Sequence, residues 1–115
     1  MKYFKIDDFK CKCGCGLNNI SEELLEKLDN AREDAGIPFI INSACRCEKH
    51  NKREGGAISS KHLTGMAVDI KTTTSIDRYK IVKSLIKNGF VGIGIANTFV
   101  HADIDRTSPL IFLYR

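Results

Sequence analysis

Residues 60–69 constrain the fold of this chain more than any other stretch. They place an imidazole, His62, and a carboxylate, Asp69, seven positions apart. Asp69 lies inside a short apolar run that predicts a buried strand. A second strand-like run, residues 98–104, carries another histidine, His101. Two histidines and one aspartate are sufficient to hold a zinc ion with one coordination position open.

Strand periodicity predicts that the polar residues of these two runs share one face of a sheet. Between residues 98 and 104 the side chains on one face are all apolar, and those on the other face are Phe99, His101 and Asp103. The apolar face is the one expected to be buried. In the earlier run Asp69 lies opposite Val68 and Ile70 in the same way. Two adjacent strands of this kind would bring their His and Asp side chains together.

Two segments have the apolar spacing of helices. The first follows a capping residue, either Asn19 or Ser21, and ends at Gly36. The second follows Ser75 and ends at Asn88 and Gly89. Apolar residues at helical spacing predict the buried face of the second helix, namely Ile76, Tyr79, Val82, Leu85 and Ile86.

The remaining runs predict short strands near residues 39–41, 90–96 and 110–114. Because consecutive strands with short links pair antiparallel, we expect an α+β fold: a small antiparallel sheet with helices packed on one face and the zinc site on the other. At 115 residues the chain is long enough for one domain only. We therefore expect a single domain, 1–115, with one zinc site and with residues 1–17 as a cysteine-rich lead.

The charge and hydropathy of the chain exclude several classes of protein. The net charge of +4, from 18 basic and 14 acidic residues, suits an anionic surface such as a bacterial cell wall. No stretch interleaves aromatic and basic residues, so we expect no nucleic-acid partner. The sequence contains no transmembrane run and no secretory signal at its start. We expect synthesis in the cytoplasm, action on the cell wall by an unknown route, no membrane insertion, and a monomer.

Five cysteines fall into two groups, Cys11, Cys13 and Cys15 in one and Cys45 and Cys47 in the other. An odd number excludes complete pairing within one chain. Three states remain open: reduced thiols, disulfides between the groups, and a second zinc ion bound by thiolates. The C-x-C spacing is tighter than that of the usual zinc knuckle, which argues against the last state.

The sequence resembles a known family at several motifs. Residues 60–69 match the pattern SxHxxGxAxD, and residues 43–46, 50–51, 55–57 and 99–103 extend the match. Together they resemble the zinc D-Ala-D-Ala carboxypeptidases, which include cell-wall peptidases and phage endolysins. That family belongs with lysostaphin-type enzymes and the hedgehog signalling domain. The resemblance covers roughly residues 39–105.

This resemblance implies a role for each matched residue. His62, Asp69 and His101 would ligate one zinc ion per chain. Arg46 would lie near the scissile carbonyl, where a guanidinium can stabilise an oxyanion. Ser60 would lie beside the metal and help to position the substrate.

The sequence departs from many relatives at the position of the general base. They carry a glutamate three residues before the last histidine ligand, where this chain has Thr98. The acidic residue on the strand face of His101 is Asp103, and we assign it as the catalytic base that accepts the proton of the attacking water.

The predicted function is therefore zinc-dependent hydrolysis of peptide bonds in the stem or cross-bridge of bacterial peptidoglycan. The activity would be that of a D,D-carboxypeptidase or an endopeptidase, and a phage or prophage endolysin is one such role. Three alternatives remain: a zinc-binding wall-recognition module without activity, a cysteine hydrolase using Cys45 or Cys47 with His50, and a cysteine-rich binding module.

Overall fold

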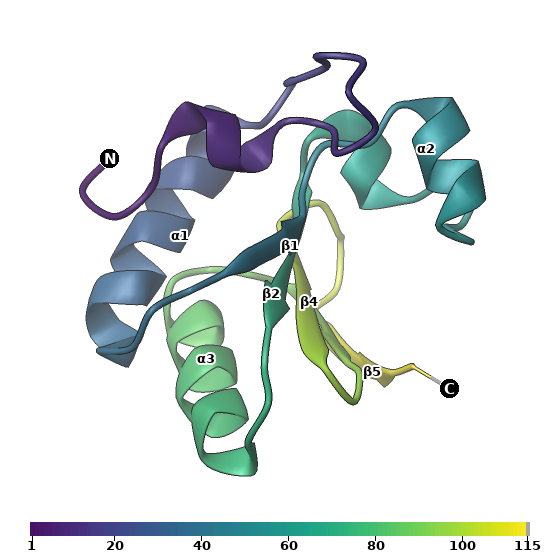
Figure 1. Cartoon of the computed structure of the whole chain (residues 1–115). Coiled ribbons are helices and arrows are strands. Elements are labelled where there is room, and N and C mark those ends of the chain that lie inside the picture. Colours follow the sequence, from purple (N-terminus) through teal and green to yellow (C-terminus); the bar gives the residue numbers. More distant parts are fainter. Residues whose placement is uncertain (115) are drawn as a thin grey trace.

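The chain folds into a five-stranded sheet with two long helices, α1 and α3, and three shorter helical segments (Figure 1). The computed structural model describes residues 1–114. In chain order its elements are η1 (Ile6–Phe9), α1 (Glu22–Ala35), β1 (Ile41–Ser43), α2 (Glu48–Arg53), η2 (Lys61–Thr64), β2 (Ala67–Lys71), α3 (Ser75–Lys87), β3 (Gly92–Ile95), β4 (Phe99–Asp103) and β5 (Leu110–Leu113). This arrangement confirms the predicted α+β fold class.

The strands of the sheet follow the order β1-β2-β4-β3-β5. Neighbouring strands pair antiparallel except β3 and β5, which are parallel. The expectation that the last three strands pair consecutively and antiparallel is therefore wrong for β5. Both edges of β4 are already occupied by β2 and β3, so the chain passes the start of β3 and adds β5 at the outer edge of the sheet.

Helices α1 and α3 pack against each other and cover one face of the sheet (Figure 1). The buried core lies between this helical layer and the sheet. Its members from the helices and the three central strands are Leu24, Leu25, Leu28, Ala31, Val68, Ile70, Ile81, Leu85, Ile93, Val100 and Ala102. The side chains that alternate with these on β2 and β4, including Asp69 and His101, project from the opposite face.

The helix boundaries agree with capping rules. The hydroxyl of Ser21 accepts a hydrogen bond from the backbone N–H of Leu24, as predicted for α1. Helix α3 is capped by Thr74, one residue earlier than predicted. Among the helices of residues 1–114, none is both long and apolar enough to cross a lipid bilayer.

The predicted buried face of α3 is wrong by part of a turn. Leu85 is buried as predicted, but Ile76 and Tyr79 are 70% and 67% exposed. Ile81 and Ser84 are buried in their place. Apolar residues occur on both sides of this helix, so two overlapping stripes fit the helical period. Packing against α1 and β4 decides which of them faces the core.

The cysteine-rich lead is packed into the same core. Phe9 is fully buried, and its carbonyl accepts a hydrogen bond from the backbone N–H of Cys45 at 3.0 Å. Phe4 packs edge-on against Phe9 with ring centroids 5.6 Å apart. These contacts hold the lead against the segment that follows β1.

Replacing Leu28 with alanine should lower the free energy of unfolding by about 2–5 kcal/mol, because the side chain is fully buried between α1 and the sheet. The same truncation at the exposed Ile76 should change it by less than about 0.5 kcal/mol. Denaturant titrations of both variants at one fixed zinc concentration measure the difference. An equal decrease in the free energy of unfolding for both variants would show that Ile76 is buried, as the sequence pattern predicts.

Candidate metal centre

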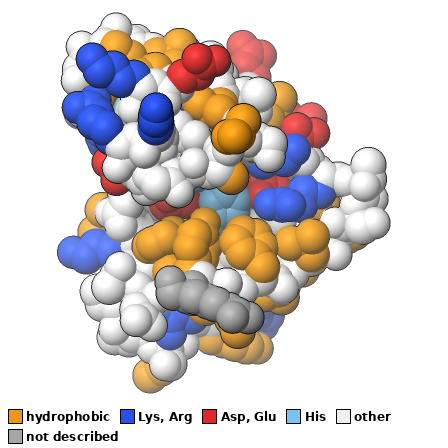
Figure 2. Space-filling model, turned by 90° about the vertical axis from the view of Figure 1, so that its right-hand side faces the viewer, with side chains coloured by type: hydrophobic (Ala, Val, Ile, Leu, Met, Phe, Trp, Pro, Cys, Tyr) orange, Lys and Arg blue, Asp and Glu red, His pale blue; other side chains and the backbone are white. Residues whose placement is uncertain are grey.

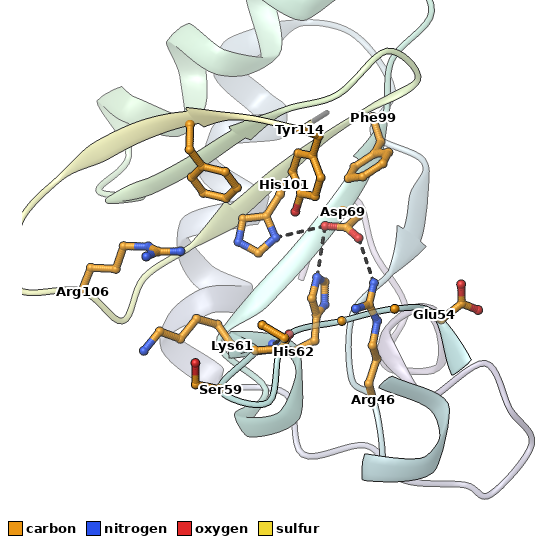
Figure 3. A pocket seen from close by; sticks show the side chains of 15 residues that line it. Arg46, Glu54, Ser59, Lys61, His62, Asp69, Phe99, His101, Arg106 and Tyr114 are labelled. Atoms are coloured by element: carbon orange, nitrogen blue, oxygen red, sulfur yellow. Dashed lines mark hydrogen bonds and ion pairs between the residues drawn. The ribbon is translucent and has the colours of Figure 1, made fainter. Parts of the chain in front are cut away.

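The three predicted zinc ligands come from three elements and meet at one point (Figure 3). Asp69 on β2 and His101 on β4 are direct partners in the antiparallel register. His62 lies on η2, which leads into β2 through Gly65 and Met66. All three side chains are buried.

The donor atoms are separated by distances that suit a small cation. Asp69 Oδ1 lies 3.1 Å from His62 Nε2 and 3.2 Å from His101 Nδ1, and all three atoms lie within 4.8 Å of one another. Donors bound to tetrahedral zinc at ~2.0–2.1 Å lie about 3.3 Å apart. The residues therefore fit a zinc ion.

The outer nitrogen of each histidine is held by a hydrogen bond. His62 Nδ1 lies 2.7 Å from the carbonyl oxygen of Ala44, which can only accept, so Nδ1 carries the proton. His101 Nε2 donates in the same way to Asp103 Oδ2 at 2.8 Å. The inner nitrogens, His62 Nε2 and His101 Nδ1, then carry lone pairs that face the carboxylate of Asp69. Three acceptors in contact need a proton or a metal cation between them, and fixed outer nitrogens are typical of metal-ligating histidines.

The ionisation of the site agrees with this assignment. Burial alone raises the pKa of Asp69, but hydrogen bonds with His101 and His62, together with their charges, lower it to about 2. Burial alone lowers the pKa of His101, whereas hydrogen bonds with Asp103 and Asp69 raise it above its ordinary value. Asp69 is therefore an anionic donor at neutral pH, and metal binding would compete with a proton at His101.

Arg46 reaches the site from the segment between β1 and α2. Its Nη2 donates to Asp69 Oδ2 at 3.2 Å, on the side of the carboxylate away from the histidines. Its Nε and Nη1 donate to Ser43 Oγ at 2.9 Å and Asn51 Oδ1 at 3.3 Å. These three anchors hold the guanidinium against the candidate metal centre.

Ser60 lies at the start of η2 and does not touch Asp69 or His101 directly. Its hydroxyl accepts a hydrogen bond from the backbone N–H of His62 at 3.2 Å and so caps the helix. Ser60 also lines the cleft in front of the candidate ligands. The structure therefore brings it close to the site through its neighbour His62.

Asp103 lies behind His101 rather than in front of it. Its carboxylate is fully buried and accepts hydrogen bonds from His101 Nε2 and, in a bidentate pair at 2.8–3.0 Å, from Arg106. Burial alone raises the pKa of Asp103, but these two partners lower it below its ordinary value. A general base must face the substrate water, whereas the described residues that line the cleft do not include Asp103.

The candidate ligands open onto a cleft of about 550 Å³. Its cationic lining residues are Arg46, Lys61 and Arg106, and its aromatic ones are Phe99, Phe112 and Tyr114. Figure 2 shows histidine at the bottom of this hollow, with hydrophobic side chains along one rim and lysine or arginine beside it. The cleft can therefore accept a chain that carries both apolar groups and negative charge.

Sequence reasoning missed several residues of the cleft, among them Arg106, Phe112 and Tyr114. The two aromatic residues lie at the C-terminal end of the chain, and they reach His101 because β5 pairs with β3, at ring-centroid distances of 5.6 and 6.5 Å. The sequence held one indication of Arg106, a glycine at position 92, where another side chain packs closely against the backbone. A Cβ at Gly92 would collide with the side chains of both Asp103 and Arg106.

A comparison with known families agrees with the geometry of the site. A family model described as Peptidase M15 matches residues 2–103. The chain belongs to the peptidase M15 family. Membership implies a metallopeptidase, and M15 peptidases depend on zinc, the metal that His62, Asp69 and His101 fit. The family resemblance is thereby confirmed, and the match extends through the cysteine-rich lead. No curated protein matches the sequence.

The cysteines of this M15 peptidase offer no thiol nucleophile. All five are unpaired, which argues against the disulfide alternative. Burial raises the pKa of Cys45, and its thiol contacts the Asn18 side chain at 3.6 Å. The ring of His50 lies 3.6 Å from Glu54, while Cys47 lies among three other cysteine sulfurs. Neither predicted cysteine has the imidazole partner that a cysteine hydrolase needs.

Proposed function

We propose that the protein is a zinc-dependent peptidase that hydrolyses peptide bonds in the stem or cross-bridge of bacterial peptidoglycan. The observation that carries the proposal is the set of three buried donors, with both outer histidine nitrogens fixed, at the floor of a cleft in an M15 chain. The SxHxxGxAxD motif supports the choice of substrate, because it resembles that of the D-Ala-D-Ala carboxypeptidases.

The cleft suits a peptide of this kind. Arg46, Lys61 and Arg106 would neutralise the carboxylate groups that peptidoglycan stem peptides carry. Phe112 and Tyr114 offer apolar surface for short side chains such as that of alanine. Such a substrate lies outside the cytoplasm, so we expect the protein to act at the wall after export or after release by lysis.

His62, Asp69 and His101 would hold the zinc ion. When bound, zinc lowers the pKa of a water to about 7 and polarises a carbonyl group. The Arg46 guanidinium faces the cleft and can donate to the oxygen on which negative charge develops. Burial, followed by the charge of Asp69, raises the pKa of Tyr114 to about 12, so its hydroxyl remains a donor at neutral pH. We assign both residues to oxyanion stabilisation.

We assign Asp103 to the positioning of His101 rather than to the proton transfer that the strand pattern predicts. Both of its oxygens are already engaged, and it is fully buried. Among the described residues that line the cleft, the one carboxylate besides Asp69 is Glu54, at the end of α2. Its side chain is 54% exposed and pairs with the ring of His50 at 3.6 Å, so we propose Glu54 as the general base, with His50 as its partner.

Asp103→Asn should mainly weaken zinc binding, whereas Glu54→Gln should mainly lower turnover. Asp103→Asn should weaken zinc binding roughly 10–100-fold, because an outer partner of a ligating histidine loses its charge. At saturating zinc its turnover should fall by less than the ~10²-fold that loss of a positioned base costs. Glu54→Gln should keep its zinc affinity and lose at least that factor in turnover. Competition with a metal chelator measures the affinity, and peptide hydrolysis measures the turnover.

The reverse pattern would return the general base to Asp103. That pattern is a loss of turnover in zinc-loaded Asp103→Asn, with Glu54→Gln unchanged.

Digestion of purified peptidoglycan tests the proposed function. With zinc present, new termini should appear and be identified by mass spectrometry, and they should be absent after treatment with a chelator. Released D-alanine would indicate a carboxypeptidase, and new internal termini would indicate an endopeptidase. A zinc-loaded, folded protein that produces no new termini from any wall preparation would instead be a recognition module without activity.

A further inference from the structure

Four cysteine sulfurs gather at a second point, away from the candidate metal centre. Cys11, Cys13 and Cys15 come from the lead, and Cys47 lies directly before α2. Their Sγ atoms all lie within 4.8 Å of one another. Sequence reasoning placed Cys45 in a group with Cys47, but alternation along the extended chain sends Cys45 into the core instead.

The distances in this cysteine cluster suit a shared metal ion. The pair distances are 3.4 Å for Cys11 and Cys13, 3.7 Å for Cys13 and Cys47, and 3.9 Å for Cys11 and Cys47. A disulfide requires ~2.05 Å between sulfurs. Four thiolates at ~2.3 Å from a tetrahedral zinc ion lie about 3.8 Å apart. The cluster therefore has the dimensions of a four-thiolate zinc site.

The local backbone explains how so tight a spacing can converge. Gly14 has φ +90°, a conformation that side chains rarely adopt, and it turns the chain between the second and third cysteine. Backbone N–H groups point at the sulfurs: that of Cys47 donates to Cys11 Sγ at 3.5 Å, and that of His50 donates to Cys47 Sγ at 3.4 Å. Donors of this kind stabilise thiolates, the form that binds metal.

We propose that Cys11, Cys13, Cys15 and Cys47 bind a second, structural zinc ion. Four protein ligands leave no open position, so this ion would hold the fold together and take no part in hydrolysis. On binding, the thiols release their protons to solvent as the four Zn–S bonds form. No redox step is involved.

The site would connect the lead to the candidate metal centre. Cys47 follows Arg46 in the chain, and the backbone N–H of Arg46 donates to the carbonyl of His62 at 3.2 Å. An ion bound at Cys47 therefore fixes the segment from which the guanidinium reaches Asp69. Cys47 lies more than 30 residues from the other three ligands. Binding therefore also closes a long loop, which should raise the stability of the folded chain.

Counting metal per chain tests the proposal. The purified wild-type protein, supplied with zinc, should hold two zinc ions. The double variant Cys13→Ser/Cys15→Ser should hold one and melt at a lower temperature. His62→Ala should also hold one, so the two sites are counted separately and the result does not depend on peptidase activity. Cys45→Ala is the matched control, because it removes the fifth cysteine, and it should keep both ions.

Two measurements on the wild-type protein keep the test valid if the double variant fails to fold. Replacement of zinc by Co²⁺ should produce the strong thiolate-to-cobalt charge-transfer absorption of a sulfur-rich tetrahedral site. A thiol-specific mercurial should release one zinc ion and leave the other bound. One zinc ion per chain, or no thiolate absorption with cobalt, would overturn the proposal. Iron in place of zinc, which also accepts four thiolates, would overturn the choice of metal.

Discussion

His62→Ala is expected to remove one zinc ion per chain and to abolish hydrolysis. The substitution deletes the donor that lies 3.1 Å from Asp69 Oδ1 and leaves only two protein ligands at the candidate metal centre. Without the metal, turnover should fall by ~10⁴-fold or more, since enzymes accelerate their reactions by at least about 10⁶-fold. Metal analysis and release of peptide termini from peptidoglycan measure the two effects.

His50→Ala provides the matched control, because His50 is the remaining histidine of the three in the chain. Its ring pairs with Glu54 and does not belong to the candidate metal centre. The variant also keeps the backbone N–H that donates to Cys47. It should retain its zinc content, which is the quantity that this control compares. A His62→Ala protein that keeps both its zinc content and its turnover would remove this centre from the mechanism.

Arg46→Ala is expected to lower turnover by about 10²–10³-fold, the cost of losing one preorganised oxyanion donor. The guanidinium is held by Ser43, Asn51 and Asp69, so it is already in place before substrate binds. In the zinc-free protein the substitution also removes one of the three partners of the buried Asp69 carboxylate, which should lower the free energy of unfolding by less than the ~3–5 kcal/mol that a fully unpaired buried charge costs. Bound zinc would compensate for part of this loss.

The turnover effect is therefore measured on the zinc-loaded protein, as kcat and KM on a defined muropeptide. Arg46→Lys should recover only part of the rate, because an ammonium group cannot reproduce the planar donor geometry. Arg53→Ala removes the same charge from the exposed side of α2 and should have little effect. If Arg46→Ala raised KM alone, the residue would bind the substrate and would not stabilise the oxyanion.

The candidate ligands could be predicted from the sequence because strand periodicity is a local property. The alternation of residues 98–104 separates His101 from the core residues Val100 and Ala102, and the structure has the same separation. The outer partners of the histidines could not be predicted in this way. Ala44 and Asp103 act through a carbonyl oxygen and a buried carboxylate, and their roles depend on which way each imidazole ring turns.

The position of β5 shows the limit of local reasoning about the sheet. A six-residue connection follows β4, and its length suits either a hairpin or a passage beyond the neighbouring strand. Competition for hydrogen-bonding edges decides between them, since both edges of β4 are occupied. This choice brings Phe112 and Tyr114 to the cleft. Likewise, the sequence alone could not decide which face of α3 is buried, because two apolar stripes fit the helical period.

The sequence by itself determined the α+β class, the strands that carry Asp69 and His101, and the motif of the M15 family. These follow from periodicity and spacing, which depend on neighbours along the chain. Only the tertiary structure decided that Cys15 rather than Cys45 joins the cysteine cluster, and that Asp103 lies behind His101. Both depend on where separate segments meet, and that is decided by packing and hydrogen bonding between residues far apart in sequence.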